Sequence, residues 1–369
     1  MNKKKQLTDA IDYVIQEGYS IFDRAIRLKK RLEEANKICL YGTGNFFENY
    51  SMHIKRYDCV CDKNPNKWGK DFNGRKCLSV SEIKEIEDVI VIIMIGDYQE
   101  VQRELDSLKI ENYYFGDIFL NIYDEKYTAK MFSDWKKQII DTIDLFEDEQ
   151  SKEIYANVIC NRIAPQYAEK TFHDMEQKGE YFDTGVFSIG DNESFVDVGA
   201  YDGDSIVAFL EKTNFKYSKI WGFELDPQNY AKICENGIIK QCSNVEVFNY
   251  GVSNESATIK ISQNGTGSRV DGNGNVEIKL IALDECIKEA VSFIKIDVEG
   301  EEINVLDGAK MLIGCYVPKL AVSVYHKLNH LWEIPRLIKK MNPDYKLFLR
   351  HHTAVVWDTN CYAYAPERE

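Results

Sequence analysis

The residues with the clearest chemical potential lie in one short segment, positions 195–205, which reads FVDVGAYDGDS. An apolar run followed by glycines is typical of a buried parallel strand, a tight turn and the beginning of a helix. Gly199 and Gly203 permit backbone conformations that a Cβ atom opposes, or let a ligand approach the backbone closely. In doubly wound α/β domains, such a turn forms the cofactor crevice at the carboxyl end of the first strand. Alone, the segment is compatible with any adenosine cofactor.

An acidic residue follows at a position that suits a ribose. The apolar run at 220–223 predicts a second strand, and this strand ends at Glu224, 25 positions after Gly199. A carboxylate at the end of the second strand can accept hydrogen bonds from both hydroxyls of a ribose. We therefore interpret Glu224 as a ribose-binding residue, with an ordinary surface glutamate as the alternative.

A third segment, 293–298, places charges inside an apolar strand. Because side chains alternate along a strand, Lys295 and Asp297 share one face, together with Glu299 if the strand continues that far. Charges in a central strand are costly unless they are paired or functional. Two interpretations stay open: a structural Lys–Asp pair at the end of the sheet, or a polar floor beneath a reacting group.

The N-terminal part contains a second glycine turn. Apolar runs predict strands at 38–41, 57–61, 89–95 and 113–115. Gly42-Thr43-Gly44 follows the first of them, and Asp62 falls 20 positions after Gly42, which resembles a dinucleotide fingerprint. Phe47, however, occupies the position of the third glycine and should obstruct close helix–strand packing. A degenerate scaffold or acceptor-docking unit and a nucleotide- or nucleotide-sugar-binding unit both remain open.

The other segments supply the elements that position these residues. Helical periodicity extends from about Thr8 to Glu34, and a polar helical region covers about 124–178. From residue 194 onward strands and helices alternate, and alternating apolar residues with glycines at 257–283 predict a hairpin-like insert. Further strands are expected at 195–198, 245–249, 320–325, 345–349 and 354–364, and helices at 205–210, 228–235, 301–306 and 334–341.

Four motifs in a fixed order carry a family resemblance. They are DVGAYDGDS at 197–205, FELDP at 223–227, LDE at 283–285 and KIDVEGEEINVLDGA at 295–309. In this order and spacing they resemble the FkbM-type family of S-adenosylmethionine-dependent methyltransferases, over roughly residues 180–366. The resemblance implies an α/β protein with a C-terminal doubly wound, Rossmann-like methyltransferase fold and an antiparallel last strand. We expect a smaller N-terminal Rossmann-like domain at 1–123, a helical bridge at 124–190 and the methyltransferase domain at 191–369.

The resemblance also implies a cofactor site for S-adenosylmethionine. Glu224 would bind the ribose, Leu225 would pack near the adenine and Gly251 would border it. The family often has Glu-Pro after the second strand, whereas Leu225 and Asp226 here precede the proline, so the family pattern does not predict the shape of this turn. The residues expected on the methionine and ribose side are Asp197, Gly199, Tyr201, Asp202 and Gly203.

The implied reaction is methyl transfer to an acceptor, and we expect a sugar hydroxyl of a surface polysaccharide, glycoconjugate or nucleotide sugar. A hydroxyl acceptor needs a base, for which Asp297 and His326 are the candidates, with Lys295 as a further catalytic residue. Asp297, Glu299 and His326 offer ligand atoms for a divalent ion, but their spacing fixes no geometry, and we predict no metal. Two alternatives are a nicotinamide-dependent oxidoreductase and a non-catalytic nucleotide-sugar-binding protein.

Composition narrows the classes of partner. The formal net charge of −14 disfavours binding along a nucleic-acid backbone, which requires a basic surface. No stretch approaches the ~18 consecutive apolar residues of a membrane span, and the basic N-terminus precedes no apolar signal segment. The 10 cysteines contain no CxxC pair, so we expect reduced thiols and a cytoplasmic location. The oligomeric state is not predicted.

Overall fold

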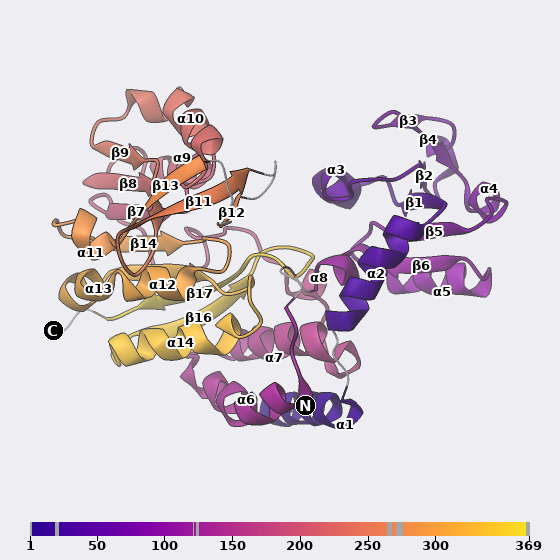
Figure 1. The fold of residues 1–369 in the computed structure, drawn as a ribbon, viewed down its shortest axis with the longest axis horizontal. Helices are drawn as coiled ribbons and strands as arrows, with labels where there is room; N and C mark the ends of the chain where they lie inside the picture. Colours follow the sequence, from indigo (N-terminus) through magenta and orange to yellow (C-terminus); the bar gives the residue numbers. More distant parts are fainter. Residues whose placement is uncertain are drawn as a thin grey trace.

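The computed structural model describes residues 2–18, 22–120, 122, 125–263, 268–270 and 276–366. Two α/β units lie at opposite ends of the molecule (Figure 1). Helices α1 (Lys3–Glu17), α6 (Ala129–Thr142) and α7 (Glu149–Ile163) form a layer along one side. The C-terminal unit carries the segments with the motifs, so its sheet sets the geometry of the predicted site.

The sheet of the C-terminal unit has seven strands in the order β16-β17-β15-β14-β7-β8-β9. The first five strands in sequence pair in parallel, whereas β17 is antiparallel to both β15 and β16. This arrangement confirms the predicted doubly wound sheet with its antiparallel last strand. The strands are β7 (Ser194–Val198), β8 (Lys219–Phe223), β9 (Val245–Phe248), β14 (Phe293–Ile296), β15 (Lys319–Ser323), β16 (Lys346–His351) and β17 (Thr359–Tyr364).

Two strand boundaries differ from the prediction. β14 ends at Ile296, and Glu299 has a φ of 54°, so the strand does not continue to Glu299 and the expected shared face is lost there. β17 begins at Thr359 rather than at residue 354, because 352–358 forms a loop into the N-terminal domain. The helices around the sheet are α9 (Asp204–Lys212), α10 (Pro227–Glu235), α11 (Leu283–Cys286), α12 (Glu302–Asp307), α13 (Lys310–Tyr316) and α14 (His330–Met341).

The predicted insert forms a small sheet of its own, with the order β10-β13-β11-β12. β11 pairs antiparallel with both β12 and β13, which confirms the hairpin-like pattern of alternating residues. Its strands are β10 (Gly251–Val252), β11 (Ala257–Gln263), β12 (Ser268–Val270) and β13 (Val276–Ile281).

The N-terminal unit is a second, smaller α/β domain with the strand order β3-β4-β2-β1-β5-β6. All neighbours pair in parallel except β3 and β4, so the unit is Rossmann-like as predicted. The hairpin β3–β4 was not expected, because its strands are short and polar. The elements are β1 (Lys37–Tyr41), α3 (Asn45–Tyr50), β2 (Cys59–Cys61), β3 (Asp71–Phe72), β4 (Arg75–Leu78), α4 (Val80–Lys84), β5 (Val89–Ile93), α5 (Gln99–Ser107) and β6 (Glu111–Tyr114).

The helical segment before β1 consists of two helices rather than one. Gly18 adopts the left-handed conformation (φ 59°) and ends α1 (Lys3–Glu17), after which α2 (Phe22–Glu34) leads to β1. α1 packs against α6 (Ala129–Thr142) and α7 (Glu149–Ile163), and its buried Leu7 and Ile11 join the core of the C-terminal half. In space, α1 therefore belongs to the helical bridge, while the proposed domain boundaries stay a prediction.

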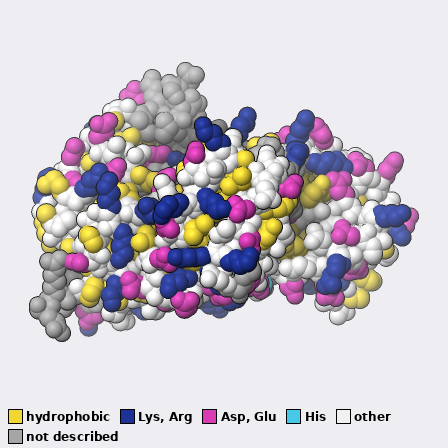
Figure 2. Space-filling model, turned by 90° about the horizontal axis from the view of Figure 1, so that it is seen from below, with side chains coloured by type: hydrophobic (Ala, Val, Ile, Leu, Met, Phe, Trp, Pro, Cys, Tyr) yellow, Lys and Arg dark blue, Asp and Glu magenta, His cyan; other side chains and the backbone are white. Residues whose placement is uncertain are grey.

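The bridge also holds α8 (Phe172–Met175), and short 3₁₀ helices connect elements throughout the chain. Within the described residues, no helix combines the length and the apolar character needed to cross a bilayer. Lys/Arg and Asp/Glu side chains intermingle over the face seen in Figure 2. The 3₁₀ helices are η1 (Ser51–His53), η2 (Pro65–Lys67), η3 (Phe115–Phe119), η4 (Ile143–Leu145), η5 (Pro165–Tyr167) and η6 (Ile239–Gln241).

The loop 352–358, between β16 and β17, connects the two α/β units. Val355 is fully buried within the hydrophobic core of the N-terminal domain, beside residues such as Phe115. The Tyr114 hydroxyl donates to the Ala354 carbonyl oxygen at 3.0 Å. Trp357 packs against Phe119, with ring centroids 5.0 Å apart. The two domains therefore share a core at this loop.

Candidate active site

Close backbone contacts require glycine in the turn after β7. Gly199 has a φ of 82°, and a Cβ atom there would lie 1.9 Å from the carbonyl oxygen of Asp297. Its N–H donates to the Phe223 carbonyl oxygen at 3.0 Å, which ties the turn to the end of β8. Gly203 has a φ of 90° at the start of α9. The turn therefore lies at the carboxyl ends of β7 and β8, where the cofactor crevice is predicted.

A buried ion pair supports this turn from beneath. Lys295 Nζ lies 3.0 Å from Asp197 Oδ1 and donates to the Gly199 carbonyl oxygen at 2.7 Å. The Ser205 hydroxyl donates to the other oxygen of Asp197, whose side chain is fully buried. Burial by itself lowers the pKa of Lys295, but the charges of Asp197 and Asp297 outweigh it and raise that pKa. This geometry favours the structural-pair interpretation, with the pair acting as a positioning device.

Backbone N–H groups of two turns, the one after β7 and the one after β8, orient the Glu224 side chain. Its Oε2 accepts from Tyr201 N at 2.8 Å and its Oε1 from Asp226 N at 2.7 Å. Each carboxylate oxygen keeps a further acceptor position, as two ribose hydroxyls require. The side chain is 8% exposed, and burial raises the pKa of Glu224 to about 7.

The remaining predicted cofactor residues surround the same crevice. Tyr201 is 56% exposed, with a φ of 48°, and Asp202 beside it is half-buried. A Cβ atom on Gly251 would lie 2.8 Å from Leu225 Cδ1, so these two residues are in contact. The structure thus brings the predicted set together, except that Asp197 lies beneath the turn and does not face the crevice. Their contacts with a cofactor stay a prediction.

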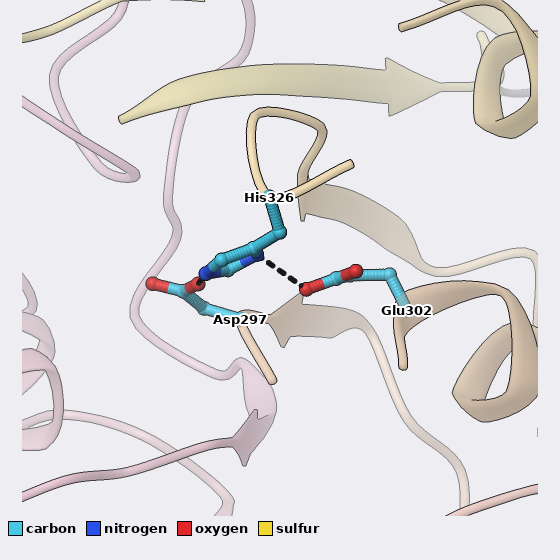
Figure 3. Close-up of side chains that lie close together, drawn as sticks. All are labelled: Asp297, Glu302 and His326. Atoms are coloured by element: carbon cyan, nitrogen blue, oxygen red, sulfur yellow. Dashed lines mark ion pairs between the residues drawn. The ribbon is translucent and has the colours of Figure 1, made fainter. Parts of the chain in front are cut away.

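A buried histidine and two carboxylates lie beyond the end of β14 (Figure 3). His326 Nδ1 forms an ion pair with Glu302 Oε1 at 2.7 Å, and His326 Nε2 lies 3.6 Å from Asp297 Oδ1. Glu302 is fully buried, and its other oxygen lies 3.0 Å from His330 Nδ1. One ring nitrogen of His326 is therefore held by Glu302, while the other is directed toward Asp297.

The charges around His326 determine its protonation. Burial lowers the pKa of His326, but the carboxylates of Glu302, Asp297 and Glu299 together raise it to about 9. Burial would raise the pKa of Glu302, yet His326 and His330 hold that pKa well below its usual value. Glu302 is therefore a permanent anion, and the neutral form of His326 is a stronger base than an ordinary imidazole.

Two tyrosines complete the surroundings of Asp297. The Tyr181 hydroxyl donates to Asp297 Oδ2 at 3.1 Å, and the Tyr325 hydroxyl lies 3.4 Å from Oδ1. Burial raises the pKa of both hydroxyls well above the usual value, so both stay protonated donors. Sequence reasoning assigned no role in the site to these tyrosines or to Glu302. The signal for Glu302 was its place in the KIDVEGEE motif. Spacing alone does not distinguish the three glutamates of this motif, Glu299, Glu301 and Glu302.

The ligand atoms of Asp297, Glu302 and His326 lie within 4.8 Å of one another, close enough to hold a metal ion. Glu302 Oε1 is, however, also 3.2 Å from the donating N–H groups of Val298 and Gly300. A cation and two N–H donors would compete for the same oxygen. We therefore interpret the group as an oriented imidazole, and the absence of a resident metal stays a prediction.

The comparisons with known proteins identify the C-terminal domain. The sequence matches the methyltransferase FkbM domain over residues 197–353, which include Gly199, Glu224, Asp297 and His326. The C-terminal domain is an FkbM methyltransferase domain. The chain is thus an S-adenosylmethionine-dependent methyltransferase, and its N-terminal region matches a C2185-like N-terminal domain over residues 34–115. No curated protein matches the sequence.

Solved structures are similar to this chain to different extents. Methyltransferase FkbM from Methylobacillus flagellatus superposes with a TM-score of 0.67 at 20% identity, covering 98% of this chain and 99% of that one. An rRNA methylase from Streptococcus thermophilus (TM-score 0.33, 14% identity) covers 48% of this chain and 90% of its own. A putative methyltransferase from Streptococcus mutans, in complex with SAH (TM-score 0.33, 12% identity), covers 47% of this chain and 89% of its own. The first match includes both domains.

The second glycine turn, in the N-terminal domain, is closed by its own side chains. Asp62 Oδ2 accepts from Thr43 N at 3.0 Å, from Thr43 Oγ1 at 2.7 Å and from Lys67 Nζ at 2.8 Å. Phe47, at the position of the third glycine, is 2% exposed and packs edge-on against Tyr57. The carboxylate expected to bind a ribose is therefore occupied within its own loop. This favours the scaffold interpretation over the nucleotide-binding one.

Proposed function

We propose that this enzyme O-methylates a sugar hydroxyl of a surface polysaccharide, glycoconjugate or nucleotide sugar. The observation that carries the proposal is His326, whose Nδ1 is held by the buried Glu302 while Nε2 is directed to the open side of the site, toward Asp297. A hydroxyl is a poor nucleophile unless a base removes its proton as it reacts. An imidazole fixed at one nitrogen by a carboxylate provides such a base at the other.

S-adenosylmethionine, when bound, supplies an electrophilic methyl group, and the protein mainly positions the reactants. The acceptor proton passes to His326 Nε2, and the buried negative charge of Glu302 stabilises the imidazolium that forms. The hydroxyls of Tyr181 and Tyr325 hold the Asp297 carboxylate in place. Asp297 in turn orients the acceptor hydroxyl. Lys295 acts indirectly, because Asp197 and the Gly199 carbonyl already hold its ammonium group.

The cytoplasm is the proposed location. All 10 cysteines are free thiols, as is usual for proteins of a reducing compartment.

The test measures the transfer of a labelled methyl group to saccharide fractions. It also measures the affinity of the enzyme for S-adenosylhomocysteine (SAH). We expect His326→Ala and Asp297→Asn to lower kcat by about 10²–10⁴-fold without changing SAH affinity, since general bases contribute about that much. His173→Ala is the matched control, because His173 lies on α8 with about half of its side chain exposed. The wild-type kcat should rise with pH toward about 9, where His326 becomes neutral. Full turnover in both variants, or no saccharide product from the wild type, would contradict the proposal.

A further inference from the structure

A pocket of about 230 Å³ lies where the two domains meet. His326, Tyr325 and Glu299 of the methyltransferase domain line one side of it. The N-terminal domain contributes His53, and the loop 352–358 contributes Trp357 and Asp358. Because His326 is both the proposed base and part of the lining, a molecule in this pocket would present its polar groups to the reacting site.

One wall of the pocket is aromatic and spans the domain boundary. The rings of His53 and Trp357 lie with centroids 4.7 Å apart. Trp357 is held in turn by Phe115 and Phe119 of the N-terminal domain. Burial lowers the pKa of His53, so its ring is neutral at pH 7. Such a wall suits the apolar C–H face of a pyranose ring, with polar groups on the opposite side fixing orientation.

The pocket is rich in carboxyl groups. Glu299 and Asp358 line it, none of the described lining residues is Lys or Arg, and the positive charge of His326 is already paired with the buried Glu302. Burial and the nearby charges of Glu180 and Asp297 raise the pKa of Asp358 well above its usual value, which favours its protonated form, so the charges that an anionic ligand would meet are those of Glu299 and Asp297. Carboxylates accept hydrogen bonds from hydroxyl and ammonium groups, whereas an anionic ligand would meet like charges.

We propose that the acceptor saccharide binds in this interdomain pocket, with a neutral or amino-substituted pyranose stacked on Trp357 and His53, and that uronic acids are excluded. The inference rests on the proposed sugar O-methylation and assigns the N-terminal domain a direct part in acceptor selection. His53 is then a specificity-determining residue that lies outside the FkbM domain.

The experiment uses the full-length enzyme and three probes, the methyl glycosides of glucose, glucosamine and glucuronic acid. Binding is followed by saturation-transfer NMR and methyl transfer by labelled S-adenosylmethionine. We expect the first two probes to bind and the glucuronide not to bind. His53→Ala and Trp357→Phe should raise the acceptor KM by about tenfold while kcat and SAH affinity change less than about twofold. Met52→Ala is the matched control, because Met52 is on the same 3₁₀ helix and is 75% exposed.

The charge of the pocket is tested by the variant Glu299→Gln, which should admit the glucuronide. Unchanged KM in His53→Ala and Trp357→Phe, or equal binding of the glucuronide by the wild type, overturns this inference while leaving the proposed function intact. An absence of binding and transfer for the whole probe set also overturns it. By contrast, failure of the wild type to methylate any saccharide fraction overturns the proposed function as well.

Discussion

The two α/β domains share one local arrangement, but its carboxylate has different partners in each. In each, a glycine turn follows the first strand and a carboxylate from the end of the next strand accepts an N–H of that turn: Asp62 from Thr43, and Glu224 from Tyr201. Asp62 also holds a hydroxyl and the Lys67 ammonium, which lower its pKa to about 2 despite burial. Within the part of the chain that the structure describes, the Glu224 carboxylate accepts hydrogen bonds from backbone N–H groups, and burial raises its pKa to about 7.

The difference shows that strand–turn spacing alone does not identify a ligand site. The N-terminal spacing is nearer to a dinucleotide fingerprint, yet its carboxylate is neutralised within the loop. The C-terminal carboxylate has no cation hydrogen-bonded to it among the described contacts and keeps open acceptor positions. We therefore propose that the number of partners supplied by the protein itself distinguishes a ligand-binding carboxylate from a structural one.

The largest contrast is expected from alanine at the first glycine of each turn. Gly199→Ala would place a Cβ atom 1.9 Å from a backbone oxygen, so we expect SAH affinity to fall by more than about 100-fold. Gly42→Ala meets the side chain of Ile95 at 2.5 Å with a φ of 101°, and should destabilise the N-terminal domain by about 1–3 kcal/mol. Calorimetric titration with SAH separates them: Gly42→Ala should bind normally, and Gly237→Ala, with open space around it, is the control.

The carboxylates themselves give the next contrast. Glu224→Gln should weaken SAH binding by about 10–100-fold, because hydrogen bonds to a charged group contribute roughly 1.5–3 kcal/mol. Asp62→Asn should leave SAH affinity within about twofold of the wild type. Equal effects of the two substitutions, measured by the same titration, would show that the comparison between the turns is wrong.

The pH dependence of cofactor binding sharpens the role of Glu224. A carboxylate that titrates near pH 7 loses acceptor strength when protonated, so SAH affinity should fall as the pH decreases below about 7. The limiting slope for one proton is about tenfold per pH unit. Titrations at pH 5.5, 6.5, 7.5 and 8.5 should show this slope in the wild type, and a flat profile in Glu224→Gln. If the affinity of Glu224→Gln kept the pH dependence of the wild type, the titrating group would be a residue other than Glu224.

The smallest effects concern stability, and their signs are opposite. The raised pKa of Glu224 means that the folded state binds the proton more tightly, so this group reduces stability as pH rises from about 4.5 to about 7. The lowered pKa of Asp62 stabilises the fold above about pH 4 and is lost as pH falls toward about 2. Each difference corresponds to about 2–3.5 kcal/mol. Urea unfolding of Glu224→Gln and Asp62→Asn across pH should show opposite trends relative to the wild type.

Much of the architecture could be predicted from the sequence, because apolar runs bounded by glycine and polar residues identify buried parallel strands. The positions of Gly199 and Glu224 at the ends of β7 and β8 could be predicted for the same reason. The end of β14 could not be predicted, since Val298 continues the apolar alternation and only the positive φ of Glu299 interrupts it. Periodicity in α1 indicated one buried face but not that α6 and α7 cover it.

Only two residues of the proposed acid–base group could be predicted from the sequence. Asp297 and His326 each follow an apolar strand, which places both at the carboxyl edge of the sheet. Burial of Glu302, rather than Glu299 or Glu301, depends on the turn before α12, and no spacing in the sequence encodes it. His53 and Trp357 belong to segments some 300 positions apart, so only the docking of two domains reveals that they meet.

The position of Val355 has a consequence for how the chain is made. The N-terminal domain leaves the ribosome first, but one of its fully buried side chains belongs to the loop before the last strand. During synthesis, Val355 can therefore cover the apolar surface around Phe115 only after the chain has emerged beyond residue 355. Domains usually complete folding in order from the N-terminus. Here the N-terminal domain is translated before the loop that completes its core, so its folding depends on what shields that surface in the interval.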